Sequence, residues 1–366
     1  TNITIPTDEK DVVIGGGSDD NDDDDDDDDD DAELTLTSKA KQTFKFKSKF
    51  KKGKSSIKFS FKSKNINQFK EIAVVTVDDD EGTIDGLSSD DEGYIEAALN
   101  RSQSIFSLLG NTPQGFGDLD IEKVLEFSSE TRFSFLSVKG GTLQGVKKGK
   151  INKSQVTLSS TDFLQVSESE KNSFDLDFEG VQIKMKFDAE AKRAKGTKLQ
   201  IERQLEVIDL SEETTNQNAT FSVYREAAYD NIIGFYQVLD AENGGIDIDG
   251  DGVADVFAGD ENYAQIAIQN RITDIDLTVE NQSSTSINGV LEAGAIIVPF
   301  LIVKGNLEAF EDIFFPFIEA NSDGVDHVMM LGDNAFGFED MKGGGDGDFN
   351  DLLVNIDINV DVSVST

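Results

Sequence analysis

The sequence lacks the residues on which much protein chemistry depends. It has no cysteine, no tryptophan and one histidine in 366 residues. The absence of cysteine excludes disulfides, thiolate metal sites and thiol catalysis, and a single imidazole excludes most zinc sites and most acid–base catalysis. Oxygen ligands are abundant, because the chain carries 72 Asp and Glu. Metal binding through oxygen is therefore the chemistry that this composition favours.

Positive charge is also scarce. The 33 Lys and Arg leave a net charge of −39 at pH 7 and a pI of about 4.1, so we expect no binding to nucleic acid. The longest apolar run is residues 295–303, well short of the roughly 20 residues of a membrane-spanning helix, and we expect no membrane span. The sequence opens at Thr1 without an initiator Met, which fits a secreted protein whose leader has been removed.

The charges near the N-terminus are segregated by sign. Residues 19–31 hold 12 Asp in 13 positions, and residues 39–64 hold 11 Lys and no acid. The Asp tract has nothing apolar to bury, so we expect residues 1–32 to be extended. Phe and Lys alternate on both sides of a Lys-Lys-Gly-Lys turn at 51–54, which predicts a Lys-rich β-hairpin. Its Lys face is either a solvated edge that resists strand pairing or a docking surface for an Asp tract, its own or a neighbour's. Binding of Ca²⁺ or mineral by the Asp tract is a third hypothesis.

Strand patterns recur through the rest of the chain. Short alternating runs between Gly, Asn and Asp turns predict an all-β fold of two tandem antiparallel, jelly-roll-like β-sandwiches with short helices and extended termini. We assign the first sandwich to residues 33–208, a polar linker to 209–218, and the second sandwich, with a C-terminal extension strand, to 219–366.

An internal duplication relates the two halves. Residues 74–101 and 235–271 share an order of features: an apolar strand, an acidic turn, a Gly/Ile/Asp motif, a second acidic turn, and a Tyr that opens a short apolar stretch ending in Asn-Arg. The second copy is about eight residues longer. The first half therefore reads as a degenerate copy that carries the acidic turns without the inserted loop.

That insertion has the spacing of a calcium loop. Residues 247–255 read DIDGDGVAD, and alternate carboxylates converge on one ion when the backbone coils around it. The predicted ligands are Asp247, Asp249, Asp251, the Val253 carbonyl and Asp255. The spacing matches the first nine positions of an EF-hand loop, but position 12 is Ala258 instead of Glu, so Glu242 or Asp260 is expected to complete the set. The alternative is a merely acidic turn.

A Gly-rich hairpin supplies a second group of oxygens. Residues 338–354 read FEDMKGGGDGDFNDLLV, and the three glycines permit the positive φ of a tight turn between two strands. The predicted ligands are Glu339, Asp340, Asp346, Asp348, Asn350 and Asp351. Three further side chains join them if the preceding loop lies alongside: Asn321, Asp323 and Asp326. The alternative is an ordinary Asx-rich turn.

This second region resembles a known family. The segments GAIIVPFLI, FIEANSDGVDHV, LGDNAFGFED and GGGDGDFNDLLV are similar to the calcium-associated domain of unknown function 4114, and the resemblance covers about residues 219–356. It implies a secreted or surface protein of bacteria that uses Ca²⁺, and it implies no activity. Gly347 stands where the family usually has a basic residue, which leaves the ligands intact and removes one counter-charge.

The hypotheses for function follow from these sites. We expect no enzyme, because the carboxylates have calcium-loop spacings and the one imidazole, His327, suits a structural hydrogen bond better than catalysis. The alternating run 355–365 can complete its own sandwich or be donated as a strand to a neighbouring copy of the chain. Residues 1–14 are a weaker candidate for such a strand, and the alternative for them is a frayed tail. The leading hypothesis is an extracellular, calcium-stabilised structural subunit of a bacterial surface filament, sheath or matrix that self-assembles head to tail as a homopolymer. The alternative is a calcium-dependent adhesin or carbohydrate-binding module that binds a surface polysaccharide.

Overall fold

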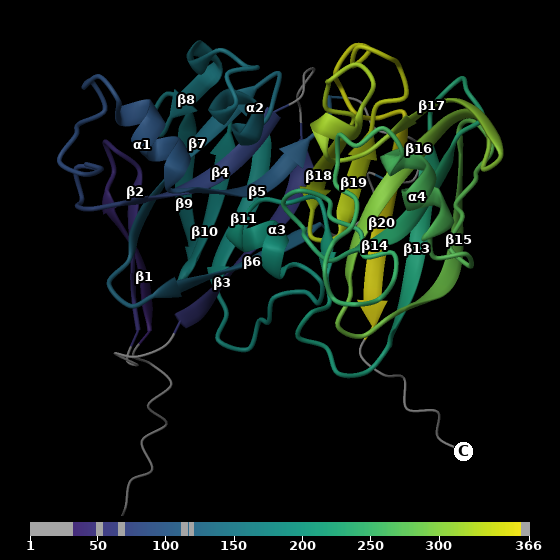
Figure 1. The fold of residues 1–366 in the computed structure, drawn as a ribbon. Helices are drawn as coiled ribbons and strands as arrows, with labels where there is room; N and C mark the ends of the chain where they lie inside the picture. The colour runs from purple at the N-terminus through teal and green to yellow at the C-terminus, as the bar shows by residue number, and fades with distance from the viewer. Residues whose placement is uncertain (1–31, 49–53, 65–69, 111–115, 117–120, 360–366) are drawn as a thin grey trace, which may run out of the picture. The chain divides into compact units, whose positions relative to one another are not determined.

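The computed structural model describes residues 32–48, 54–64, 70–110, 116 and 121–359 (Figure 1). The predicted extended segment with its Asp tract, the turn of the predicted Lys-rich hairpin and the last residues of the C-terminal strand lie outside the described residues. Among the helices that are described, none is long and apolar enough to cross a membrane.

The first sandwich consists of two antiparallel sheets. One has the order β1-β2-β7-β4-β5, with β8 paired to β7, and the other has the order β6-β3-β11-β10-β9. Their strands are β1 (Glu33–Ser38), β2 (Thr43–Lys47), β3 (Lys54–Lys64), β4 (Lys70–Val77), β5 (Ser102–Leu108), β6 (Glu122–Ser128), β7 (Arg132–Lys139), β8 (Val156–Leu158), β9 (Leu164–Glu170), β10 (Ser173–Phe178) and β11 (Val181–Phe187).

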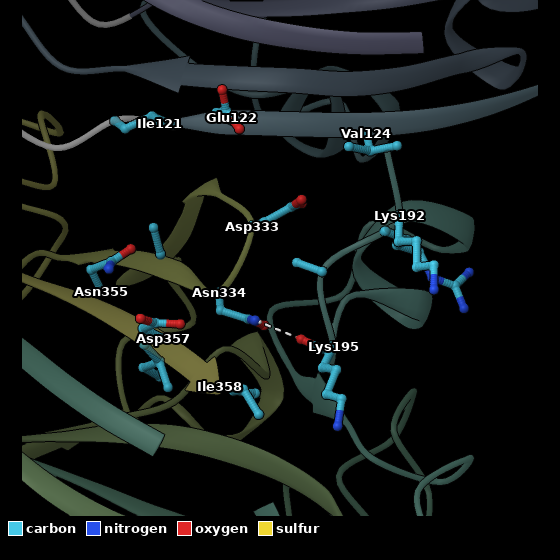
Figure 2. Close-up of a pocket in the computed structure, with 14 residues that line it drawn as sticks. Ile121, Glu122, Val124, Lys192, Lys195, Asp333, Asn334, Asn355, Asp357 and Ile358 are labelled. Carbon is cyan, nitrogen blue, oxygen red and sulfur yellow. Dashed lines mark hydrogen bonds between the residues drawn. The ribbon is translucent and has the colours of Figure 1, made fainter. Parts of the chain in front are cut away.

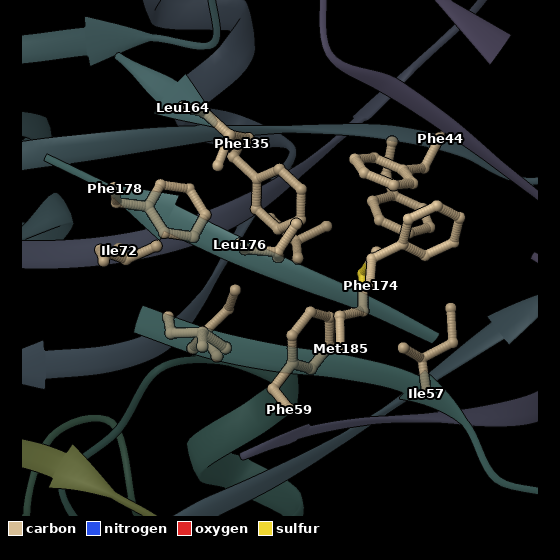
Figure 3. Close-up of a cluster of buried hydrophobic side chains, with 14 of the residues drawn as sticks. Phe44, Ile57, Phe59, Ile72, Phe135, Leu164, Phe174, Leu176, Phe178 and Met185 are labelled. Atoms are coloured by element: carbon tan, nitrogen blue, oxygen red, sulfur yellow. The ribbon is translucent and has the colours of Figure 1, made fainter. Parts of the chain in front are cut away.

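Phenylalanine side chains fill the space between these sheets. Phe44 of β2 lies 5.1 Å from Phe174 of β10, and Phe135 of β7 lies 5.3 Å from Phe178 of β10, measured between ring centroids. Figure 3 shows these four rings in the core that the two sheets share. Both pairs meet edge to face, a geometry worth about 0.5–1.5 kcal/mol per pair beyond the buried area. The Phe content of the sequence is thus concentrated in a sandwich core.

The Lys-rich segment alternates as predicted, but it does not form the predicted hairpin. β2 pairs with β1 and β7 in one sheet, whereas β3 pairs with β6 and β11 in the other. Phe44 and Phe46 of β2 therefore enter the same core as Ile57 and Phe59 of β3, but from the opposite side. Alternation determines which face of a strand is buried, and it leaves the pairing partner open.

Lysines on the outer faces of β2 and β3 lie close to acids. Lys58 of β3 contacts Glu122 of β6 at 2.6 Å, and Lys45 of β2 contacts Glu130, in the turn after β6, at 2.6 Å. These pairs are partly exposed to solvent, where ion pairs contribute little to stability. Both strands are paired on two sides within their sheets, so they do not form the edge that the first hypothesis expected, and docking of an Asp tract on the Lys face stays a prediction.

The second sandwich is also built from two antiparallel sheets. One has the order β12-β16-β14, with β17 paired to β16, and the other has the order β15-β13-β20-β19-β18. Their strands are β12 (Ile208–Asp209), β13 (Gln217–Arg225), β14 (Ile232–Val238), β15 (Ser283–Leu291), β16 (Ile296–Asn306), β17 (Ala309–Phe314), β18 (Val328–Gly332), β19 (Ala335–Phe338) and β20 (Leu352–Asn359).

Two expectations concern the ends of this sandwich. The stretch 209–218, expected to be a linker, begins within β12 and ends within β13, and its Leu210 is fully buried. Ile208, Asp209 and Leu210 alternate as in a strand, but the polar residues that follow them make the whole stretch resemble a linker. The C-terminal strand β20 lies between β13 and β19, so as far as Asn359 it completes its own sheet.

The helices are short, as expected, and the two sandwiches share a junction. Helical segments are α1 (Tyr94–Asn100), α2 (Leu143–Lys147), α3 (Lys198–Glu202) and α4 (Tyr263–Gln269), with 3-10 turns η2 (Lys153–Gln155) and η3 (Ile318–Ala320). At the junction Lys123 of β6 pairs with Asp333 at 2.8 Å, and Phe116 meets Tyr224 edge to face at 5.4 Å. The side chain of Lys123 is 1% exposed. The sandwiches are therefore joined by a buried ion pair as well as by apolar contacts.

Candidate metal centres

The Gly-rich loop connects two paired strands of the second sandwich. β19 ends at Phe338 and β20 begins at Leu352, and these two residues are partners in the antiparallel ladder. The intervening residues 339–351 therefore leave and return at the same edge, with their acids at both ends. This is the arrangement that the sequence predicts for the second group of oxygens.

Three carboxylates of this loop converge. Glu339, Asp346 and Asp348 each place one oxygen within 4.8 Å of the others. Glu339 is 1% exposed, and its Oε2 has no hydrogen-bond partner among the described residues. A buried carboxylate oxygen without a donor is costly. A cation between the three carboxylates removes that cost.

The pKa values of the carboxyl groups in this loop also reflect their burial and their mutual repulsion. Burial, followed by the charges of Asp351 and Asp346, raises the pKa of Glu339 to about 8. Burial and the charge of Asp346 raise the pKa of Asp348 to about 6, and burial, together with the proximity of Asp340, raises the pKa of Asp351 to about 7. These carboxylates resist ionisation together in the absence of a counter-ion.

The other predicted ligands of this loop have hydrogen bonds that place them around the three. Asp340, 4% exposed, accepts a hydrogen bond from Asn231 Nδ2 at 2.7 Å, and its backbone N–H donates to Asp351 Oδ2 at 2.8 Å. Asn350 Nδ2 donates to Asp348 Oδ2 at 2.6 Å. Asp340, Asn350 and Asp351 therefore support the converging carboxylates, as is common around metal ligands.

One neighbouring acid escaped the sequence analysis. Glu226 follows β13, its N–H donates to the carbonyl of Asp351 at 3.0 Å, and its charge contributes to the raised pKa of Asp348. The signal in the sequence is an acid directly after a long alternating strand. Its position beside the Gly-rich loop depends on the pairing of β13 with β20, which the sequence does not reveal.

The loop at 321–327 does lie alongside, but its side chains do not join the oxygen group. Asp323 Oδ2 accepts a hydrogen bond from Gly343 N at 2.7 Å, and a second hydrogen bond of 3.0 Å joins it to His327 Nε2. The side chain of Asn321 accepts a hydrogen bond from Phe315 N and donates one to the Phe315 carbonyl. Asp326 lies elsewhere, where burial raises its pKa to about 6.

The predicted EF-like loop is closed by a β-bridge between Ile246 and Val256. Within it, Asp247, Asp249 and Asp255 place one oxygen each within 4.8 Å of one another. Asp247 accepts from Gly250 N at 2.7 Å and from Gly252 N at 2.8 Å; these backbone donors, that of Gly252 first, lower its pKa.

The remaining members of this predicted set have other partners. Asp251 is outside the group of three, and its Oδ1 accepts from Val253 N at 2.8 Å. Of the two expected completing ligands, Glu242 pairs with Arg203, and Asp260 Oδ2 accepts from Phe257 N at 2.8 Å. The loop therefore offers an exposed, partial oxygen set.

The acidic turn of the first half that the sequence analysis aligned with the EF-like loop also has a β-bridge and a Tyr hydrogen bond. A β-bridge joins Ile84 to Leu87, and Tyr94 Oη donates to the Gly82 carbonyl at 2.6 Å, just as Tyr263 Oη donates to the Gly244 carbonyl at 2.8 Å. In this turn the Arg101 guanidinium contacts both Asp78 and Asp85, so a positively charged side chain lies between these two acids.

Residues 291–359 match the family described as domain of unknown function (DUF4114). The DUF4114 segment contains the whole Gly-rich loop and excludes the EF-like loop. The searches of curated proteins and of solved structures found no match to the chain.

The DUF4114 segment fits a hard divalent cation. Its loop combines an orphaned, buried carboxylate oxygen on Glu339 with donors that are all oxygen, the ligand type that Ca²⁺ prefers. Glu339, Asp346 and Asp348 would hold the ion, which would supply positive charge that offsets the clustered carboxylates. The ion would thereby link the end of β19 to the loop that leads into β20.

A cleft lies at the junction of the sandwiches, apart from both acidic loops (Figure 2). Its volume is about 590 Å³, and its walls come from β6, the segment 192–195, the turn before β19, and β20. Within it Asn334 Nδ2 donates to the Lys195 carbonyl at 2.7 Å. The walls are polar and aliphatic, and no aromatic residue is among them.

Proposed function

We propose that this chain is a calcium-stabilised structural protein and that its Gly-rich loop is a Ca²⁺ site. The observation that carries the proposal is the buried Glu339 carboxylate, whose Oε2 lacks a donor while Asp346 and Asp348 converge on it. An ion bound only by the folded form stabilises it by mass action. Calorimetric titration of the metal-free protein with Ca²⁺ tests this directly, and the absence of heat or of any rise in melting temperature contradicts it.

We also propose a second Ca²⁺ at the EF-like loop. Its support is the DxDxDGxxD spacing together with the convergence of Asp247, Asp249 and Asp255. The double change Asp249→Ala with Asp251→Ala should lower the melting temperature in Ca²⁺ and alter it little in EGTA. Equal losses in both conditions reject this assignment.

The proposed role is that of an extracellular building block in a bacterial surface filament, sheath or matrix. The chain has no disulfides, and the near-millimolar affinities of extracellular calcium modules suffice to hold such ions. Because β20 is paired on both sides, a donated strand would have to come from residues 360–366 or 1–14. The acceptor would be an open edge such as β15, whose sheet neighbour is β13.

Electron microscopy and light scattering test the assembly. Purified protein should form polymers that are lost when the donated terminus is deleted, and EGTA should weaken them. A monodisperse monomer under every condition contradicts the assembly hypothesis and leaves the calcium sites to be judged by titration. Our expectation that the chain is not an enzyme stays a prediction.

We further infer that the first half descends from the same ancestral unit as the second. The matching bridges and the two Tyr-to-Gly hydrogen bonds support this duplication. In the first half Arg101 would have taken over the role of a cation near Asp85. Arg101→Ala should therefore destabilise the first half in Ca²⁺ and EGTA alike.

The second candidate function is a calcium-dependent adhesin or carbohydrate-binding module. The cleft of about 590 Å³ favours it, since its Asn355 and Asp357 can bond to hydroxyl groups. The absence of aromatic residues from its walls disfavours sugar stacking. Binding of purified protein to anionic or neutral polysaccharides, abolished by Asn355→Ala with Asp357→Ala, would support this candidate.

A further inference from the structure

We propose that Asp323 and His327 are positioning residues that set the Gly-rich loop in its ion-binding conformation before the ion arrives. The inference rests on the Ca²⁺ site proposed above, and it concerns two side chains that lie outside the converging oxygens. Both come from the loop between η3 and β18. They reach the two parts of the chain that must be brought together to form the site.

Asp323 holds the glycine side of the loop. Its Oδ2 accepts a hydrogen bond from Gly343 N at 2.7 Å, three residues before the ligand Asp346. Nearby, Gly344 packs so closely against Val325 that a Cβ would come within 2.9 Å of Val325 Cγ1. Although burial opposes it, hydrogen bonds with Gly343 and His327 lower the pKa of Asp323, which favours the carboxylate that accepts from Gly343 N.

His327 holds the other side, at the end of β19. Its Nδ1 faces the carbonyl oxygen of Glu339 at 2.8 Å, and its Nε2 faces Asp323 Oδ2 at 3.0 Å. A carbonyl oxygen only accepts, so Nδ1 donates there. The ring is fully buried and stacks on Phe314 with 3.5 Å between centroids and 2° between planes. The backbone of the buried ligand Glu339 is thereby tied through one imidazole to Asp323, and through Asp323 to Gly343.

This connection reduces the freedom of the metal-free loop. Ligands that are already in place lose less conformational entropy on binding an ion, and partners outside the ligand set typically change metal affinity by about 10–100-fold when removed. The two side chains should therefore matter more to Ca²⁺ affinity than to the survival of the fold. If the two side chains had a purely structural role, their removal would affect the stability of the fold more than the Ca²⁺ affinity.

The test compares three variants of the full chain in the Asp249→Ala, Asp251→Ala background, which removes two carboxylates of the EF-like loop and leaves the Gly-rich loop intact. His327→Phe keeps a ring that can stack on Phe314 and removes both hydrogen bonds. Asp323→Ala removes the acceptor for Gly343. Ser322→Ala changes an exposed neighbour in the same loop and is the matched control. Each protein is titrated calorimetrically with Ca²⁺, and its circular dichroism is recorded in EGTA.

We expect the dissociation constant for Ca²⁺ to rise about 10–100-fold for His327→Phe and Asp323→Ala, with Ser322→Ala unchanged and all three folded in EGTA. Dissociation constants within twofold of the control overturn the inference. If one of the two variants does not fold, the other decides, and a dissociation constant within twofold of the control there overturns the inference equally well. Failure of the background protein itself to bind Ca²⁺ overturns the proposed site instead, so the two failures are distinguishable.

Discussion

Gly345 lies directly against the buried carboxylate of Glu339. A Cβ added at Gly345 would come within 1.8 Å of Glu339 Oε1, and the residue has a φ of +46°, a conformation that L-residues with side chains rarely adopt. Both the contact and the conformation therefore require glycine. The Gly-rich loop is thus shaped around a carboxylate whose other oxygen lacks a donor among the described residues.

This contact predicts that Gly345→Ala disables the Ca²⁺ site. The methyl group must displace the Glu339 carboxylate or the loop, and we expect Ca²⁺ affinity to fall at least about tenfold, which corresponds to about 1.4 kcal/mol. Gly347→Ala is the control, because its φ is +70° but the nearest atom to an added Cβ is 3.8 Å away. Calorimetric titration distinguishes them, and equal effects of the two substitutions would show that backbone strain alone is responsible.

Glu339→Gln should maintain or raise the stability of the protein in EGTA and leave it less stable than the wild type in Ca²⁺. In EGTA the neutral amide removes a buried acid whose pKa is raised to about 8, so the variant should unfold at the same urea concentration as the wild type or a higher one. With Ca²⁺ at about 100 times its dissociation constant, the wild type should gain about 2.7 kcal/mol that the variant lacks. A variant that loses the same stability in both conditions contradicts the assignment of Glu339 as a ligand.

The ion pair at the junction gives a prediction independent of calcium. Lys123→Ala leaves Asp333, 10% exposed, without its partner, and breaking such a buried pair costs about 3–5 kcal/mol. Lys184→Ala, which removes an exposed pair with Glu170, should cost less than about 1 kcal/mol. Urea unfolding in EGTA measures both. Similar small losses would show that the junction does not depend on this pair.

Glu71 of β4 should make the first sandwich sensitive to pH. Burial raises its pKa above the usual 4.5, against hydrogen bonds from Ser104, Leu143 and Ser107. The folded state thus keeps a proton that the unfolded state has lost, and stability falls as pH rises from about 4.5 through the folded pKa. Glu71→Gln should remove this dependence, so its advantage over the wild type should grow with pH.

The measurement is urea unfolding in EGTA between pH 4 and pH 8. Glu126→Gln is the control, because it makes the same chemical change at an exposed residue of the neighbouring sheet. A constant difference between Glu71→Gln and the wild type would mean that the carboxyl of Glu71 ionises alike in both states.

The sequence predicted the strands and their buried faces better than their partners. Phe44, Phe46, Ile57 and Phe59 face inward as their alternation predicts, yet β2 and β3 lie in different sheets because period two carries no information on pairing. The convergence of Glu339, Asp346 and Asp348 followed from a hairpin, which is local in sequence.

What the sequence could not supply depends on long-range pairing. Glu226 approaches the Gly-rich loop only because β13 pairs with β20, and Asp323 proved to be a partner of His327 and Gly343 rather than one of the converging oxygens. Likewise, the spacing of residues 247–255 did not reveal that Glu242 pairs with Arg203. Short-range patterns identify candidate ligands, and tertiary contacts decide which of them converge.

The most direct test of the calcium site is a high-resolution crystal structure of the protein grown with Ca²⁺. We expect a strong peak between Glu339, Asp346 and Asp348, with six to eight oxygens at about 2.3–2.6 Å and an anomalous signal for calcium. A map with ordered water or no density among these carboxylates, at saturating Ca²⁺, would contradict the account.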